Sequence, residues 1–323
     1  MMTVIKKIIR LTGISRLKLF ILRRLDGGIK SKWSLKKLEK GVTLLYKNNM
    51  GRELNLRNPV LFTEKIQWYK LFYNHPDLGR IVDKYTFKQY LNEKLGDRYT
   101  VPIYGMWTNI SQIHKEWDHL PDCFVLKSTI CDSGRNIIII KRKHEVEFNE
   151  IKKELQQWFD PYNTLINSFC RAYHGTKPRI IAEQYVAQAA QLNDYKFFCF
   201  NGNPFCIYAY GYTGRKISGD SGAVTISSTE SVTFYDMSWN KLNVKWGYAS
   251  IGDVDKPEHF DEMIEISKKL SAGFPLVRVD FFEHKEKLFI AEMTFYPGGG
   301  LRIITPMEFD EKLGTLFELP LKT

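Results

Sequence analysis

The sequence predicts an α+β fold in which a helical N-terminal part is followed by antiparallel strand hairpins. Residues 38–89 have mostly helical patterns, with breaks at Asn58-Pro59 and His75-Pro76. Two later pairs of β-rich runs are joined by short turns, which predicts antiparallel pairing within each pair. The paired runs span residues 194–200 with 205–210, and residues 277–282 with 288–295.

Further strands and helices are expected around these hairpins. Strands are predicted at residues 98–107, 123–127, 137–140 and 179–186, and helices at residues 111–117, 146–159 and 259–270. Residues 215–229 are polar and contain glycine, so a loop is expected there.

The composition is that of an ordinary globular protein, with 44% hydrophobic and 26% charged residues. The five cysteines are odd in number and have no CxxC spacing, so neither a disulfide framework nor a structural zinc site is expected. A reducing compartment, and therefore the cytoplasm, fits this pattern.

The net charge of +11 is concentrated at the N-terminus. Residues 1–40 contain twelve Lys or Arg against two acidic residues, a net +10 that leaves +1 for the other 283 residues. Val4, Ile5, Ile8 and Ile9 fall on one helical face of this segment. It suits either the surface of an anionic inner leaflet or packing on the protein body. Nucleic acid is not an expected partner, because the rest of the chain has no basic excess.

The second C-terminal hairpin places polar residues on one face. Side chains two residues apart in a strand point to the same face of the sheet. Arg278 and Asp280 therefore share a face, and so do Glu292 and Thr294. A turn near residues 285–287 would set Asp280 opposite Glu292 and Arg278 opposite Thr294. Adjacent carboxylates require a cation, and Mg²⁺ bound together with nucleotide phosphates meets that need. The alternative is a surface ladder in which Arg278 merely pairs with an acid.

Lys127 ends a predicted strand and is followed by a turn containing Ser133 and Gly134. A lysine in this place can reach phosphate oxygens while the N–H groups of the turn cover them. An ordinary strand–turn–strand has the same pattern.

A third segment runs Glu183-Gln184-Tyr185-Val186 and is followed by Asp194 and Lys196. A strand that leaves one lobe can present backbone groups to an adenine edge. A plain strand is the alternative.

Taken in this order, the motifs resemble the ATP-grasp superfamily, and most closely its TupA-like branch, which is associated with teichuronopeptide and other polysaccharide biosynthesis. The resemblance covers roughly residues 45–318. The residues that carry it are Phe62-Thr63-Glu64-Lys65-Ile66-Gln67-Trp68-Tyr69-Lys70, Asp83-Lys84-Tyr85, Phe124-Val125-Leu126-Lys127, Pro178-Arg179-Ile180-Ile181-Ala182-Glu183, Asp194-Tyr195-Lys196-Phe197, Arg278-Val279-Asp280 and Glu292-Met293-Thr294-Phe295-Tyr296-Pro297-Gly298.

This resemblance implies an ATP-grasp fold in which two α+β lobes clamp ATP. With the basic segment of residues 1–40 set apart by its charge, the expected units are residues 41–118 (N-terminal region), 119–186 (lid) and 187–323 (C-terminal subdomain). The implied site residues are Lys84, Lys127, Ser133 and Gly134 at the ATP phosphates, Glu183, Gln184, Tyr185 and Val186 at the adenine, Lys196 after this hinge, Asp280, Glu292 and Thr294 at Mg²⁺, and Arg278 beside an acyl phosphate.

The implied activity is that of an ADP-forming carboxylate–amine ligase, which would join an amino acid or peptide to a carboxylated sugar of a surface polysaccharide. Three positions depart from the family pattern: Asp132 enters the lid turn, Gln184 replaces a frequent lysine, and Thr294 replaces a frequent asparagine. A nucleotide-binding protein with weakened catalysis is therefore one alternative. A glycosyltransferase of the same pathway is the other.

Overall fold

The computed structural model describes residues 33–130, 136–160, 169–186, 194–218, 223–247, 250 and 252–321. The amphipathic segment predicted within residues 1–32 lies outside these ranges, as do Asp132, Ser133 and Gly134 of the lid turn. Among the described helices, none is long and apolar enough to cross a bilayer.

Helices dominate the first part of the chain, as predicted, and recur between the strands. The α-helices are α3 (Leu35–Met50), α4 (Phe62–Phe72), α5 (Leu78–Val82), α6 (Lys84–Leu95), α7 (Ile110–Glu116), α8 (Phe148–Trp158), α10 (Phe260–Ser271) and α11 (Met307–Leu316). The 3₁₀ turns are η1 (Asp97–Tyr99), η2 (Trp117–His119), η3 (Lys143–Glu145), η4 (Arg171–Tyr173) and η5 (Pro297–Gly300).

The described strands form one continuous sheet in which every pairing is antiparallel. The strands are β1 (Ile103–Trp107), β2 (Phe124–Ser128), β3 (Ile137–Ile140), β4 (Ile180–Gln184), β5 (Asp194–Phe200), β6 (Asn203–Ser218), β7 (Ala223–Asp236), β8 (Lys241–Leu242), β9 (Leu276–His284) and β10 (Lys287–Thr294). Their order is β1-β4-β2-β3-β7-β6-β5-β9-β10, and β8 pairs with β7.

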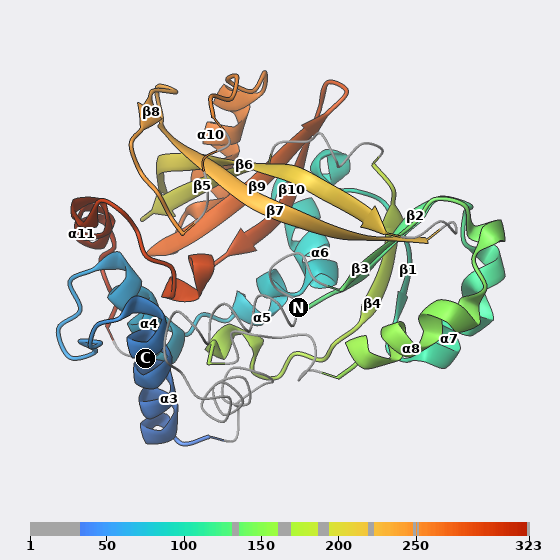
Figure 1. The fold of residues 1–323 in the computed structure, drawn as a ribbon, viewed down its shortest axis with the longest axis horizontal. Helices are drawn as coiled ribbons and strands as arrows, with labels where there is room; N and C mark the ends of the chain where they lie inside the picture. Colours follow the sequence, from blue (N-terminus) through green and yellow to red (C-terminus); the bar gives the residue numbers. More distant parts are fainter. Residues whose placement is uncertain are drawn as a thin grey trace.

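The prediction of a loop at residues 215–229 is wrong, because strands β6 and β7 include most of these residues. Residues 213–218 of β6 pair with residues 225–229 of β7, across a register irregularity between Thr213 and Lys216. The far end of β7 also pairs with β3, at Ile139–Val224 and Ile140–Ala223. Figure 1 shows this long hairpin reaching from the C-terminal strands to the lid strands. An antiparallel ribbon can contain as many polar residues as a loop, so polar composition alone did not distinguish the two.

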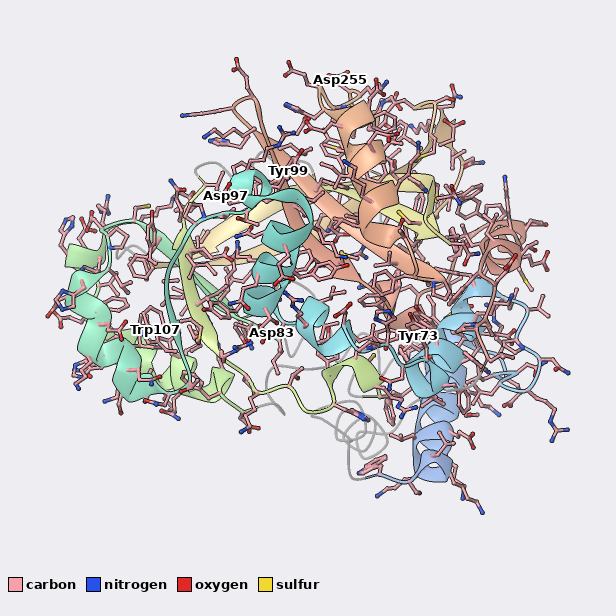
Figure 2. The ribbon with its side chains drawn as sticks, turned by 180° about the vertical axis from the view of Figure 1, so that it is seen from behind. Tyr73, Asp83, Asp97, Tyr99, Trp107 and Asp255 are labelled. Atoms are coloured by element: carbon pink, nitrogen blue, oxygen red, sulfur yellow. The ribbon has the colours of Figure 1, made fainter. Side chains whose placement is uncertain are left out.

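The half of the sheet that contains the predicted lid, residues 119–186, also includes β1, and one face of β1 to β4 is buried under α7 and α8. Phe124, Leu126 and Ile138 on that face pack with Trp107 and with Leu155 of α8. Figure 2 shows Trp107 between its strand and these helices. Alternation in β2 then points Val125 and Lys127 to the opposite face, which the two helices leave uncovered.

The C-terminal half of the sheet packs one face against α10. Phe197 of β5 contacts Phe260 of α10 and Phe281 of β9, and Val277 and Val279 lie fully buried on the same side. The intervening residues of β9, Arg278 and Asp280, therefore point to the other face.

Helix α4 fixes the turn that follows β10. The Gln67 amide donates to the carbonyls of Gly299 and Gly300, both at 2.9 Å, and Lys70 donates to Gly299 at 2.5 Å. Gly298, Gly299 and Gly300 all have positive φ, a backbone shape that glycine adopts without a steric penalty. Polar residues of α4 thus hold the turn at the end of the β9–β10 hairpin.

Candidate functional site

The β9–β10 hairpin sets Asp280 opposite Glu292 and Arg278 opposite Thr294, as the sequence predicts. The two turn residues are Lys285 and Glu286, so the turn is centred half a position before the middle of the predicted range. An irregularity between Ile290 and Glu292 restores the predicted register by adding one residue to β10. This bulge turns Glu292 to the polar face although Ile290, two residues earlier, lies in the core.

A row of polar side chains crosses four strands at one level of the sheet. Lys196 of β5 pairs with Tyr208 of β6 on one side and with Asp280 of β9 on the other, and Asp280 pairs with Glu292 of β10. The Lys196 ammonium donates to Asp280 Oδ2 at 2.6 Å and lies 3.6 Å from Asp194. Antiparallel neighbours share a face, so the row places a lysine beside the acidic pair.

Arg278 is the centre of the cluster on this face. Its guanidinium holds Asp280 through two hydrogen bonds of 2.6 Å and donates to Tyr208 (2.9 Å), Thr294 (3.1 Å) and Glu292 (3.2 Å). Burial alone would lower the pKa of Arg278, but Asp280 and Tyr208 raise it above its ordinary value. Arg278 is therefore a permanent cation between the two carboxylates.

Glu292 remains ionised and reachable. Burial would raise its pKa, but the charges of Lys196, Arg278 and Lys84 lower it to about 2. Its side chain is 40% exposed, whereas that of Asp280 is fully buried. Glu292 is thus the acid of the pair that faces outward.

The lid contributes a second charged cluster around Glu183. Lys127 Nζ lies 2.6 Å from Glu183 Oε2, and Lys88 Nζ of α6 lies 3.3 Å from Oε1. Burial would raise the pKa of Glu183, but Lys127 and Lys88 lower it to about 2. Val125 and Ile139 are buried beside this cluster, with Tyr185 packed against them. A charged group and a small apolar surface therefore share the uncovered face of the lid sheet.

Helix α6 connects the two clusters. Its first residue, Lys84, lowers the pKa of Glu292 by its charge, and Lys88, one turn later, binds Glu183. The helix is fixed at its start by Asp83, whose Oδ1 accepts from the N–H groups of Tyr85 and Thr86 and pairs with Arg179 at 2.8 Å. Figure 2 shows Asp83 at this end of α6, between the lid and the C-terminal strands.

The model of the TupA-like ATP-grasp family matches residues 64–318 of this chain, which is most of its length. The chain belongs to the TupA-like ATP-grasp family. Its fold is accordingly the ATP-grasp fold, with the α+β character that the sequence predicts. No protein of curated function matches the sequence.

Solved structures with some similarity include several ligases. The D-alanine–D-alanine ligase of Bacillus anthracis is 14% identical, with 74% of this chain covered and a TM-score of 0.44. That of Helicobacter pylori is 15% identical (74% covered, TM-score 0.39), and an L-amino acid ligase of Bacillus licheniformis is 13% identical (74% covered, TM-score 0.42). This chain covers 66%, 61% and 48% of those chains, in each case less than two thirds.

Within this ATP-grasp chain, the predicted hinge residues have separate environments. The carboxylate of Glu183 contacts Lys127 and Lys88. The backbone N–H of Gln184 donates to the Pro102 carbonyl at 2.9 Å. Tyr185 and Val186 follow the end of β4 and are half-buried. The side chain of Glu183 is thus bound by lysines, while adenine contact by the segment after β4 stays a prediction.

The predicted metal ligands fit Mg²⁺ in donor type. Asp280, Glu292 and Thr294 offer oxygen alone, the donor that Mg²⁺ prefers. Within the described residues, no group of three or more His, Cys, Asp or Glu is arranged to hold a metal. The protein would therefore supply a few ligands and leave the rest to phosphates and water, as Mg²⁺–nucleotide sites commonly do.

Sequence reasoning missed two residues of these charged clusters, Lys88 and Tyr208. Lys88 lies four residues after Lys84, which places both on one side of a helix, and this spacing was a usable signal. Tyr208 occupies a predicted strand among other aromatic residues, and its contact with Arg278 had no signal in the sequence.

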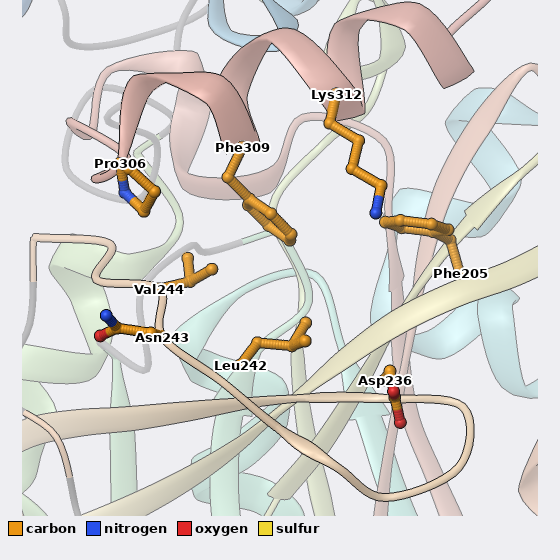
Figure 3. A pocket seen from close by; sticks show the side chains of 8 residues that line it. All are labelled: Phe205, Asp236, Leu242, Asn243, Val244, Pro306, Phe309 and Lys312. Carbon is orange, nitrogen blue, oxygen red and sulfur yellow. The ribbon is translucent and has the colours of Figure 1, made fainter.

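A pocket of about 350 Å³ lies apart from these clusters (Figure 3). It is lined by Phe205, Asp236, Leu242, Asn243, Val244, Pro306, Phe309 and Lys312. None of the predicted site residues lines it, so it has no part in the site described above.

Proposed function

We propose that this protein is an ATP- and Mg²⁺-dependent carboxylate–amine ligase. The proposal rests on one face of the β9–β10 hairpin, where Asp280, Glu292 and Arg278 lie together. The charge of Lys84 also acts on this face, because it lowers the pKa of Glu292. Membership of the ATP-grasp family supports ATP as the nucleotide. Acids, an arginine and lysines in one place are the groups that phosphoryl transfer requires.

The proposed reaction has two steps. An oxygen of the acceptor carboxylate attacks the γ-phosphorus of ATP, ADP leaves, and an acyl phosphate forms. The amine nitrogen then attacks the acyl carbon, phosphate leaves with the bonding electrons, and the nitrogen releases a proton to give the amide. Arg278 would stabilise charge on the transferred phosphoryl group, and Lys84 and Lys127 would bind the phosphates of the nucleotide.

Asp280, Glu292 and Thr294 would hold Mg²⁺ by their oxygen atoms. The ion would supply charge neutralisation at the β- and γ-phosphates. The apolar patch of Val125, Ile139 and Tyr185 lies beside Lys127, which suits a flat base whose phosphates reach the lysine.

The proposed acceptor is a carboxylated sugar of a surface polysaccharide, and the proposed donor is an amino acid or peptide. This rests on the polysaccharide association of the TupA-like branch. Residues 1–40 would hold the enzyme at the cytoplasmic leaflet, where lipid-linked glycans are assembled, because a net charge of +10 attracts anionic lipids. Sedimentation with anionic and with neutral vesicles, comparing the full chain with a variant that lacks residues 1–32, tests this placement.

The ligase proposal is tested by incubating the protein with ATP, Mg²⁺, candidate uronic acids and amino acids. ADP, phosphate and an amide should appear together. AMP as the sole nucleotide product would contradict the acyl-phosphate mechanism. Preferential stabilisation by a UDP-sugar over ATP would favour the glycosyltransferase, and tight ATP binding without turnover would favour a weakened enzyme.

A further inference from the structure

Glu183 is held by two lysines that differ in how firmly they are anchored. Lys88 also donates to the Val101 carbonyl at 2.8 Å, and its side chain is 15% exposed. Lys127 is 29% exposed and lies at the closer distance from Glu183, 2.6 Å against 3.3 Å. Each lysine takes a different oxygen of the carboxylate, so one can leave while the other remains.

A buried carboxylate constrains any lysine that has to move. The side chain of Glu183 is 5% exposed, and a buried charge that loses its partner carries a large desolvation penalty. If Lys127 were its sole partner, Glu183 would retain Lys127 against the pull of the nucleotide phosphates. With a second lysine in place, the carboxylate stays paired when Lys127 turns away.

We propose that Lys88 is a positioning residue that keeps Glu183 paired and so frees Lys127 to bind the phosphates of ATP. This inference rests on the proposed function, because it takes the phosphate ligand of Lys127 from there. Lys88 itself would not contact the nucleotide. It acts through Glu183, and its effect should disappear when the carboxylate is removed.

The test is a double-mutant cycle on nucleotide binding, measured by calorimetry with ATP, ADP and AMP in the presence of Mg²⁺. The variants are Lys88→Met, Glu183→Gln and the double variant. Lys88→Arg keeps the charge, and Lys94→Met removes an exposed lysine of the same helix as a matched control.

Lys88→Met should weaken the binding of ATP and ADP roughly tenfold. The affinity for AMP should stay within about twofold of the wild type, because AMP lacks the β- and γ-phosphates that Lys127 would bind. In the Glu183→Gln background, the same substitution should change ATP binding by less than about twofold. Lys88→Arg and Lys94→Met should bind like the wild type.

Two results would overturn the inference alone: unchanged ATP binding by Lys88→Met, or an equal loss with and without Glu183. If Lys88→Met does not fold, Lys88→Gln takes its place in the cycle, with the same losses expected. A wild-type protein that binds no ATP refutes the proposed function and this inference together, whereas the first two results leave the proposed function intact.

Discussion

The ammonium of Lys196 lies 2.6 Å from Oδ2 of Asp280, its cross-strand neighbour. Asp280 is fully buried and also receives two hydrogen bonds from Arg278, so it pairs with two cations at once. The acid at the centre of the proposed metal site therefore also holds the C-terminal sheet together. Loss of this acid should affect folding as well as activity.

Asp280→Ala should lower the free energy of unfolding by roughly 3–5 kcal/mol, because it leaves Arg278 and Lys196 buried without their partner. Urea unfolding followed by circular dichroism measures the change. Asp255→Ala, which removes an exposed acid, should cost less than about 0.5 kcal/mol. Equal stability of the two variants would show that Asp280 contributes nothing to the sheet.

Glu292→Gln should separate function from stability. Its side chain is 40% exposed and solvent screens its charge, so this substitution should cost less stability than Asp280→Ala, whereas ATP turnover should fall by about 10²-fold or more when the outward-facing carboxylate is lost. ADP release under saturating ATP is the measurement, and Glu286→Gln at the exposed turn is the control. Wild-type turnover by Glu292→Gln would exclude a role for this acid in the reaction.

The acid sensitivity of the protein should depend on Glu183. The pKa of this residue falls from an ordinary 4.5 to about 2 in the folded state, so the stability it contributes is complete above pH 4.5 and is lost as the pH falls toward 2. Unfolding midpoints in urea between pH 7 and pH 3 should therefore drop less steeply for Glu183→Gln than for the wild type. Parallel curves would mean that the folded-state pKa is not depressed.

Gly300→Ala should destabilise the turn after β10. Gly300 has a φ of +60°, and an added Cβ would lie 2.5 Å from the Gln67 amide nitrogen and 2.8 Å from Ile66 Cβ. Gly273 has a φ of +84° with open space around it, so Gly273→Ala isolates the backbone cost. Gly300→Ala should cost roughly 1–3 kcal/mol more than Gly273→Ala by thermal unfolding. Equal costs would contradict the tight packing of α4 on this turn.

Local patterns predicted which residues of the β9–β10 hairpin lie opposite each other, because these residues are joined by one short turn. The register of Asp280 and Glu292 follows from strand alternation and a short turn, although the structure reaches it by a bulge at Ala291. The alternation of buried residues shifts by one position at that bulge: Leu288 and Ile290 are buried before it, and Met293 and Phe295 after it. This shift is visible in the sequence as a change in the spacing of the apolar residues.

Contacts between distant segments had no such signal. Glu183 and Lys88 are far apart in sequence and meet because the tertiary fold brings α6 beside β4, which no local pattern specifies. The β6–β7 hairpin was mistaken for a loop for a related reason. Its outer part pairs with β3 through backbone hydrogen bonds, which are independent of the polar side chains that suggested a loop.

The most direct test of the nucleotide site is a crystal structure with Mg²⁺ and a non-hydrolysable ATP analogue. The β- and γ-phosphates should lie between Lys127 and the Asp280–Glu292 pair, Lys88 should still contact Glu183, and Lys127 should contact phosphate. A nucleotide bound elsewhere, for example in the pocket beside Phe205 and Lys312, with Lys127 still paired to Glu183, would contradict the account.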